Sequence, residues 1–239
     1  NTFAILYRTN AQSRAFEEAL RKRNIPYRIY GGISFYQRKE IKDVIAYIRL
    51  VLNPSDEEAL RRIVNYPARG IGDTTIKKIS ESATTHAQTL WKIWTSPLEW
   101  GVKLNAGTQT KLKNFATLIT ELQEEVKTKN ADEFVKDLIK KTGIFADVYV
   151  DNLPENVSKQ ENLQELVNAI IDFCTNREES GESATISDFL SEVSLATDQD
   201  KGDEGEAEKV TLMTIHAAKG LEFPNIYIVG MEEDLFPSS

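Results

Sequence analysis

The chain has 239 residues, of which 41% are hydrophobic and 28% charged, and its 29 basic and 37 acidic residues give a net charge of −8 at pH 7. This composition is typical of a globular protein with one or two domains and a buried core. The negative balance excludes attachment to nucleic acid by overall charge, so any such contact has to be local.

The cysteine content and the hydropathy pattern indicate the compartment. Cys174 is the only cysteine, which excludes an internal disulfide and a cysteine-based zinc site and favours a reducing cytosol. We expect Cys174 to be a buried side chain on a helix, not a reactive thiol. No apolar run reaches the roughly 20 residues that span a bilayer, and the first residues do not resemble a signal peptide. We therefore expect a cytoplasmic chain without a membrane partner or a metal site.

The amino-terminal region predicts a strand, a helix and a second strand. Residues 3–7 form a short apolar run, and Thr9 and Gln12 have the spacing of a capping box for a helix that ends at Asn24-Ile-Pro26. Residues 27–30 then have strand character and end at Gly31-Gly32. A strand, helix, strand unit of this kind builds a parallel sheet.

Apolar side chains recur at helical spacing from Gln37 onward, and helices are predicted through the middle of the chain up to about Val193. Residues 198–208 are rich in acid and glycine, which predicts a mobile linker.

Strand character returns at residues 210–214 and 226–229, so sheet-forming segments lie at both ends of a helical middle. The simplest topology is an insertion. We expect one α/β domain, residues 1–32 and 209–239, split by an all-helical domain of residues 33–208.

The segment from Thr214 to Phe223, Thr-Ile-His-Ala-Ala-Lys-Gly-Leu-Glu-Phe, directly follows a predicted strand. Small residues, a glycine, a lysine and a carboxylate at the end of a parallel strand suit phosphate and sugar contacts, although an ordinary strand-to-helix loop is the simpler alternative. Together with residues 231–237, Met-Glu-Glu-Asp-Leu-Phe-Pro, the segment resembles motif V of the superfamily 1 DNA helicases of the UvrD/Rep/PcrA type.

This resemblance implies roles for four residues of the segment. Thr214 and His216 would face the phosphates of single-stranded DNA, whereas Gly220 and Glu222 would face the nucleotide, with Glu222 accepting from a ribose hydroxyl. The chemistry agrees, because a carboxylate suits a sugar hydroxyl, and hydroxyl and imidazole groups can donate to phosphate.

The segment Leu6-Tyr-Arg-Thr-Asn-Ala-Gln-Ser-Arg14 resembles the same family, which implies that Arg8 and Asn10 contact single-stranded DNA. Arg8 brings a fork of donors to the carboxyl end of a strand, and Asn10 adds a neutral donor near a helix start. Without the resemblance, a helix cap beside a solvated arginine is the alternative.

The resemblance continues through residues 31–43, where Arg38, Lys39 and Lys42 form a small basic patch. We include Arg38 and Lys39 among the candidate DNA contacts, although a solvated face is the simpler interpretation of such a charge run. Phe35 and Tyr36 suit either base stacking or packing of a helix start. Gly31-Gly32 suits a hinge between domains.

The segment from Tyr66 to Lys78, Tyr-Pro-Ala-Arg-Gly-Ile-Gly-Asp-Thr-Thr-Ile-Lys-Lys, is similar to the hairpin of a helix-hairpin-helix element. Gly70 and Gly72 allow a tight turn whose amides face a phosphate, Thr75 adds a hydroxyl and Lys77 adds charge. We expect Asp73 to cap the following helix. A plain turn between two helices is the alternative.

The sequence thus predicts an α/β plus all-α fold: part of a RecA-like, P-loop-NTPase-like domain with a helical insert. The resemblance implies part of an ATP-dependent DNA helicase that binds single-stranded and duplex DNA and shares ATP with Mg²⁺ with a first RecA-like domain. The sequence contains no Gly-Lys pair and hence no Gly-x-x-x-x-Gly-Lys-[Ser/Thr] loop, so we expect a truncated chain with no catalytic residues, no tightly held nucleotide and no ATPase activity of its own. Repair or replication proteins are possible partners of the insert. The alternatives are a non-catalytic module that binds duplex DNA or protein, and part of a helicase-nuclease subunit.

Overall fold

The computed structural model describes residues 3–202 and 208–231. The chain forms two compact units. Unit 1 comprises Asn1–Lys42, Asp151–Ala169 and Ser191–Ser239, and unit 2 comprises Asp43–Val150 and Ile170–Leu190. Within the described ranges, none of the helices is long and apolar enough to cross a membrane.

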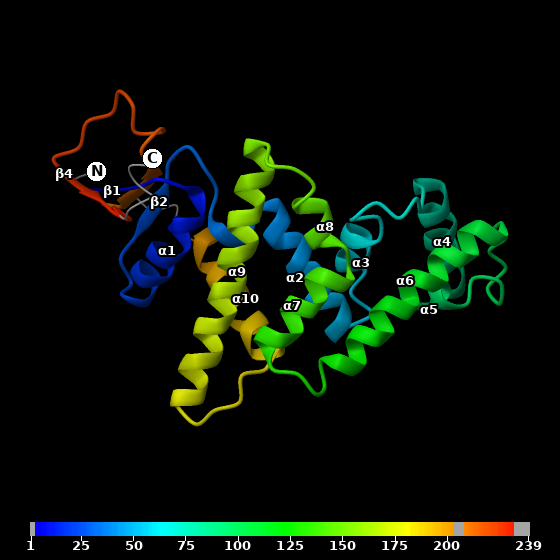
Figure 1. Ribbon diagram of the computed structural model, residues 1–239. Coiled ribbons are helices and arrows are strands. Elements are labelled where there is room, and N and C mark those ends of the chain that lie inside the picture. Colours follow the sequence, from blue (N-terminus) through cyan, green and yellow to red (C-terminus); the bar gives the residue numbers. More distant parts are fainter. Residues whose placement is uncertain (1–2, 203–207, 232–239) are drawn as a thin grey trace. The chain divides into compact units, whose positions relative to one another are not determined.

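Unit 1 contains a four-stranded parallel sheet (Figure 1). Its strands are β1 (Phe3–Tyr7), β2 (Tyr27–Ile29), β3 (Val210–Thr214) and β4 (Asn225–Ile228), and their order in the sheet is β2-β3-β1-β4. All three neighbouring pairs are parallel. The predicted strands at both ends of the chain are confirmed, and the carboxyl-terminal strand β3 lies between the two amino-terminal ones.

The core of the sheet is formed by its central strands and by the segment that follows β3. Ala4, Leu6 and Met213 are buried together. The residues that pack against this cluster come from the segment after β3: Ile215, Ala217, Ala218 and Phe223. The apolar members of that segment therefore hold it against the sheet, which leaves its polar side chains to face outward.

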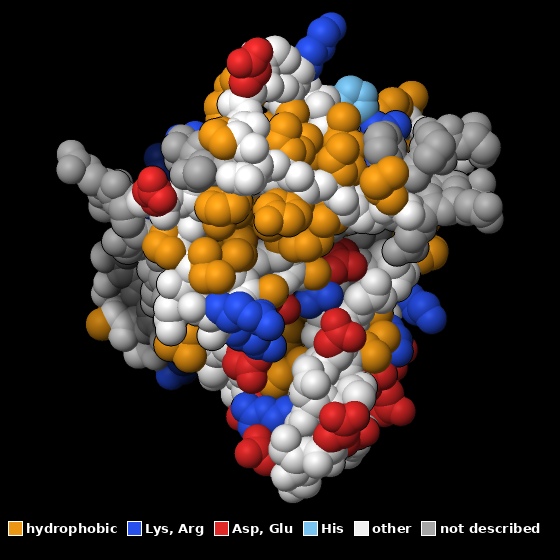
Figure 2. Space-filling view, turned by 90° about the vertical axis from the view of Figure 1, so that its left-hand side faces the viewer, with side chains coloured by type: hydrophobic (Ala, Val, Ile, Leu, Met, Phe, Trp, Pro, Cys, Tyr) orange, Lys and Arg blue, Asp and Glu red, His pale blue; other side chains and the backbone are white. Residues whose placement is uncertain are grey.

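The edge strand β4 is exposed along its whole length. Ile226, Tyr227 and Ile228 are 48%, 57% and 48% exposed, and Phe3 of the neighbouring β1 is 42% exposed. Figure 2 views the molecule from the side on which these strands lie and shows hydrophobic side chains gathered on that face. Among the described residues, nothing covers this apolar edge of unit 1.

The other elements of unit 1 begin with the short helical turn η1 (Asn10–Gln12) and α1 (Ser13–Lys22), followed after β2 by η2 (Phe35–Gln37) and the first turn of α2 (Lys39–Leu52). The side chain of Gln12 accepts hydrogen bonds from the backbone amides of Arg8 and Thr9, at 2.9 and 3.0 Å, which confirms the predicted capping box, with Thr9 as the cap of the turn that leads into α1. Phe35 and Tyr36 are buried, at 0% and 6% exposed, so they pack inside the unit and are not free to stack on bases.

Unit 2 is helical, as predicted for the middle of the chain. Besides most of α2, it contains α3 (Glu57–Ile63), α4 (Asp73–His86), α5 (Leu90–Thr95), α6 (Ala106–Glu125), α7 (Ala131–Lys141) and α8 (Ile144–Val148). Two long helices, α9 (Pro154–Glu179) and α10 (Ile186–Gly202), contribute residues to both units. Cys174 on α9 is buried, as expected.

The linker predicted at residues 198–208 is wrong in its first part. Helix α10 continues through Gly202, because nothing in the acidic sequence after Thr197 breaks the helical backbone before the glycine. Residues 203–207 lie outside the described residues.

Candidate nucleic-acid interface

The carboxyl ends of β1, β2 and β3 meet at one edge of the sheet, because the strands are parallel. The segment after β3 is joined to the end of β1 by a bond from the Ile215 amide to the Tyr7 carbonyl, 2.9 Å. The segment after β2 is joined to β3 by a bond from the Tyr30 amide to the Leu212 carbonyl, 2.9 Å. We call the residues that follow these strands, 8–14, 30–34 and 214–223, the carboxyl edge.

Arg8 and His216 contact each other at this edge, although they are 208 positions apart in sequence. Arg8 Nη1 lies 3.2 Å from His216 Nδ1, and both side chains reach solvent. If Arg8 donates to Nδ1, the neutral imidazole carries its proton on Nε2, where it remains available as a donor. The pair therefore combines a charged fork with a second N–H at one exposed position.

Two further predicted residues lie beside this pair. Asn10 is exposed, and its side-chain oxygen lies next to Gly32, at 3.9 Å from where a Cβ would stand. Thr214 Oγ1 accepts from the Ala217 amide at 3.2 Å, which fixes the turn after β3. The Thr214 hydroxyl proton is not used in that bond, so it can still be donated.

Gly31 brings the segment after β2 close to the segment after β3. Its φ is +71°, in the left-handed region that favours glycine, and a Cβ there would stand 3.3 Å from the Cβ of Ala217. The first glycine of the pair is therefore needed for a tight approach at the carboxyl edge.

Gly220 and Glu222 lie in the same segment as Thr214 and His216, and both are exposed. Among the described residues, no heavy atom comes within 4 Å of where a Cβ of Gly220 would stand. Residues 232–237, part of the predicted motif, lie outside the described residues.

Arg38 and Lys39, predicted as a basic patch, separate in the structure. Lys39 is exposed at the start of α2, whereas Arg38 is only 6% exposed. The guanidinium of Arg38 donates to the Asn10 carbonyl, the Ser13 hydroxyl and the Asn162 side chain. The solvated face expected for this charge run is wrong for Arg38, and a direct phosphate contact by it would require this network to open.

The predicted hairpin, residues 66–78, lies in unit 2 and comprises part of the loop between α3 and α4 together with the start of α4. Gly70 and Gly72 are exposed, Thr75 is half-buried and the Lys77 side chain is 78% exposed. The helix cap falls on Gly72 and not on Asp73, which is the first residue of α4. Without a side chain at the cap, the first amides of α4 have no side-chain acceptor at that position, and Asp73 adds negative charge in the first turn.

Two residues that the sequence analysis did not single out hold this hairpin. Arg69 donates to the carbonyls of Ile63, Tyr66 and Pro67 through Nη1, at 2.9–3.2 Å, and to the carbonyl of Thr142 through Nη2, at 3.0 Å. The side chain of Asn65 accepts from the amides of Arg69 and Ile71. The sequence places an arginine in the turn, but no local pattern indicates that it donates to these carbonyls.

Lys111 of α6 also reaches the hairpin. Its ammonium donates to the Gly70 carbonyl at 2.8 Å. A Cβ on Gly70, whose φ is +65°, would stand 2.8 Å from the same nitrogen. With Lys77 and Lys78, Lys111 makes the hairpin locally basic on a chain of negative net charge.

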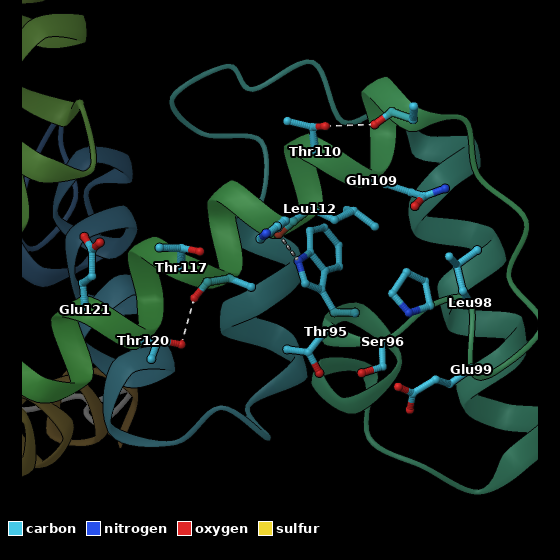
Figure 3. A pocket seen from close by; sticks show the side chains of 15 residues that line it. Thr95, Ser96, Leu98, Glu99, Gln109, Thr110, Leu112, Thr117, Thr120 and Glu121 are labelled. Carbon is cyan, nitrogen blue, oxygen red and sulfur yellow. Dashed lines mark hydrogen bonds between the residues drawn. The ribbon is translucent and has the colours of Figure 1, made fainter.

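A groove of about 760 Å³ lies between α5 and α6, and none of the predicted site residues lines it (Figure 3). Thr110 and Thr120 on its α6 wall donate to the carbonyls of Ala106 and Ala116, each at 3.0 Å, so these hydroxyls are used within the helix. The groove is therefore more apolar than its threonine content indicates.

Acidic and cysteine or histidine side chains do not gather into a metal site in residues 3–202 and 208–231. The carboxyl edge instead brings together the donors of Arg8, Asn10, Thr214 and His216, and the hairpin carries exposed glycines and lysines. Both suit anionic ligands such as phosphate.

A parallel sheet with donors along its carboxyl edge is typical of α/β proteins that bind nucleotides or nucleic acids. Comparison with known families agrees, since residues 1–239 match the UvrD-like helicase C-terminal domain. The chain belongs to this family.

DNA helicases are among the proteins to which the chain is similar. The chain is 40% identical to DNA helicase II of Salmonella typhimurium over 98% of its length, and 39% identical to the ATP-dependent DNA helicase PcrA of Bacillus subtilis over 99%. It is 36% identical to the ATP-dependent DNA helicase UvrD1 of Mycobacterium tuberculosis. In each case it covers 32% of the relative, so the chain spans about a third of the length of these proteins.

Proposed function

We propose that the chain is part of an ATP-dependent DNA helicase, in which the carboxyl edge of unit 1 contacts single-stranded DNA and nucleotide, and the hairpin of unit 2 contacts duplex DNA. In this proposal residues 1–32 and 209–239 form part of a RecA-like domain, and residues 33–208 form its helical insert. The proposal is supported by the family and by the parallel sheet that both ends of the chain build together.

The contact between Arg8 and His216 is the observation that carries the single-strand site. The half-buried Arg8 and the exposed His216, predicted separately from two distant segments, lie 3.2 Å apart, with Asn10 and Thr214 on the same edge. Donors that converge in this way can hold consecutive phosphate oxygens without reading bases.

The nucleotide would lie beside Gly220 and Glu222. Open space against the Gly220 backbone and an exposed carboxylate two residues later fit a sugar that approaches the segment after β3. When bound, ATP with Mg²⁺ supplies the phosphoryl transfer that drives movement. Glu222 would accept from the ribose hydroxyl, and this chain contributes no phosphate-binding loop of its own. We therefore expect negligible ATPase activity from the purified chain, and robust turnover would contradict this expectation.

The hairpin would grip the backbone of duplex DNA through the amides near Gly70 and Gly72, the Thr75 hydroxyl and the Lys77 ammonium. Arg69, Asn65 and Lys111 would support this function by fixing the turn before any ligand arrives. Such contacts carry no sequence information, so binding should be independent of base sequence and weakened by salt.

The single-strand site is tested by the change Arg8→Ala. The loss of one phosphate contact should weaken binding of a fluorescent oligothymidine by about tenfold at low salt and should reduce the slope of log K against log salt by about one unit. Fluorescence anisotropy of the 239-residue chain measures both quantities. Arg23→Ala, which removes an exposed arginine at the end of α1, is the matched control and should leave affinity nearly unchanged. An equal loss in both variants would indicate that overall charge, and not the carboxyl edge, binds the strand.

A further inference from the structure

Helix α9 presents three polar side chains to the segment that carries Arg8 and Asn10. They are Glu161, Asn162 and Glu165, whose spacing places them on one side of the helix. All three and their partners belong to unit 1. The partners are spread along residues 8–14 directly or through Arg38, so the helix contacts the whole length of the predicted single-strand segment.

Asn162 is the central member of this group and is 3% exposed. Its side-chain oxygen accepts from Arg38 Nη1 at 2.6 Å, and its amide nitrogen donates to a carboxylate oxygen of Glu40. The reverse orientation of the amide would place NH₂ against a guanidinium and oxygen against a carboxylate, so both neighbours fix the same rotamer. No aliphatic side chain can replace both functions.

Arg38 transmits the position of Asn162 to the segment. Its Nη2 donates to the Asn10 carbonyl and the Ser13 hydroxyl, each at 2.7 Å. Ser13 donates in turn to Glu17, at 2.6 Å, so the buried positive charge is balanced through a hydroxyl. Because burial disfavours the charged form, it lowers the pKa of Arg38, and the nearby Glu17 opposes this effect. A buried arginine with three fixed acceptors holds the backbone of Asn10 firmly.

The two flanking residues of α9 contact the ends of the same segment. Glu165 accepts from Arg14 Nε at 2.6 Å. Glu161 lies close enough to Thr9 and Arg8 for both to lower the pKa of its carboxyl group. Glu161 therefore acts on the residue next to Arg8, and Glu165 acts on the start of α1.

From these contacts we infer that Asn162 is a positioning residue for the single-strand site: through Arg38 it fixes the Asn10 backbone, and with Glu161 and Glu165 it holds residues 8–14 in the conformation that binds DNA. This inference rests on the function proposed above. It assigns to a helix more than 150 residues away in sequence a part in single-strand binding that no motif in that helix indicates. DNA bound at the single-strand site should then stabilise α9 around Asn162, and changes in α9 should alter the affinity for DNA.

The test compares Asn162→Ala, Asn162→Asp and the control Gln164→Ala on the exposed side of α9. Oligothymidine affinity is measured by anisotropy, and the fraction of folded chain is measured by urea unfolding, so that affinity is compared only where each variant is folded. Asn162→Ala should weaken binding by about tenfold, because Arg38, the donor to the Asn10 carbonyl, loses the acceptor that fixes its other nitrogen. Asn162→Asp keeps an acceptor for Arg38 but faces Glu40, and should weaken binding by about threefold. Gln164→Ala should not change it.

A purely structural role would lower stability and leave the affinity of the folded chain unchanged in both Asn162 variants, and this result would overturn the inference. If neither variant folds, hydrogen exchange of the unmodified chain decides. Added oligothymidine should slow exchange at residues 8–14 and also around Asn162 on α9, whereas protection confined to residues 8–14 would overturn the coupling.

The outcomes also separate the inference from the proposed function. If the unmodified chain binds oligothymidine and Arg8→Ala weakens binding, the site stands, and the Asn162 variants then test the inference alone. If Arg8→Ala and the control Arg23→Ala behave alike, the proposed site itself fails, and the inference fails with it.

Discussion

The carboxyl edge of unit 1 and the hairpin of unit 2 are two candidate phosphate sites that form by different routes. The carboxyl edge is assembled from segments up to 208 positions apart, and it exists only when β3 is inserted between β1 and β2. The hairpin is contained in residues 66–78, and most of its contacts are local. A site made by topology depends on the whole sheet, whereas a local site depends on its own turn.

The two regions also differ in the contacts that hold their central arginines, Arg38 and Arg69. At the carboxyl edge, a buried arginine, Arg38, is held by side chains from other elements. At the hairpin, Arg69 is held mainly by backbone carbonyls of the preceding turn, and its distant partners are the Thr142 carbonyl and the rings of Tyr47 and Phe115. Changes at the hairpin should therefore lower the stability of unit 2 and leave the carboxyl edge intact.

The largest effect is expected from Arg69→Ala. The change removes one donor from each of four carbonyl groups, of which those of Ile63 and Tyr66 keep a second donor, and it removes the cation–π contacts with Tyr47 and Phe115. The free energy of unfolding should fall by about 3 kcal/mol, as measured in urea. Arg61→Ala, which removes a half-exposed arginine of α3, is the control and should cost less than about 1 kcal/mol. Equal losses in the free energy of unfolding would show that the turn keeps its conformation without Arg69.

A smaller effect is expected from Gly70→Ala, with Gly101→Ala as its control. Both glycines have positive φ, so each alanine should cost about 1 kcal/mol of stability. Only the alanine at Gly70 displaces the Lys111 ammonium from the hairpin. Duplex DNA affinity, measured by anisotropy, should therefore fall about threefold for Gly70→Ala and stay unchanged for Gly101→Ala. A similar loss of duplex affinity in both variants would indicate that the hairpin does not bind duplex DNA.

The smallest effect is expected in the pH dependence of stability, through Glu161 of α9 beside the carboxyl edge. Burial raises the pKa of Glu161 above its usual 4.5, and the nearby Thr9 side chain and the charge of Arg8 offset this only in part. Folding therefore favours the protonated form, so the free energy of unfolding should decline as pH rises from about 4.5 through the raised value. Glu161→Gln should remove this decline in urea unfolding measured across that range.

Glu155→Gln provides the opposite case for that experiment. A hydrogen bond from Lys159 lowers the pKa of Glu155, so its contribution to stability is present above the usual pKa and is lost as pH falls. Glu155→Gln should remove a loss of stability at low pH. If both variants changed the profile in the same sense, the environment assigned to Glu161 would be wrong.

The sequence predicted the elements of the fold well, because their signals are local. The apolar runs at residues 3–7 and 210–214 and the Thr9–Gln12 spacing correspond to β1, β3 and the start of the first helix. The place of β3 within the sheet was not predictable in this way, because no local pattern states which strand pairs with which.

The candidate site was predicted less completely, and the errors have a common cause. Arg38 was expected at the surface because it lies in a charge run, but burial depends on Ser13 and Asn162, which are distant in sequence. Asp73 was expected as a cap, but the backbone places Gly72 there. Residues whose role depends on a distant partner, such as Asn162 and Arg69, carry no local signal.

The exposed strand β4 has a practical consequence for all of these experiments. Its outer edge has no neighbouring strand among the described residues, and its isoleucines and tyrosine are open to water. Such an edge is a template on which further chains can add as strands, so self-association and precipitation compete with folding as concentration rises. Titrations of this chain with DNA are therefore best made in dilute protein, with the light scattering of each sample recorded.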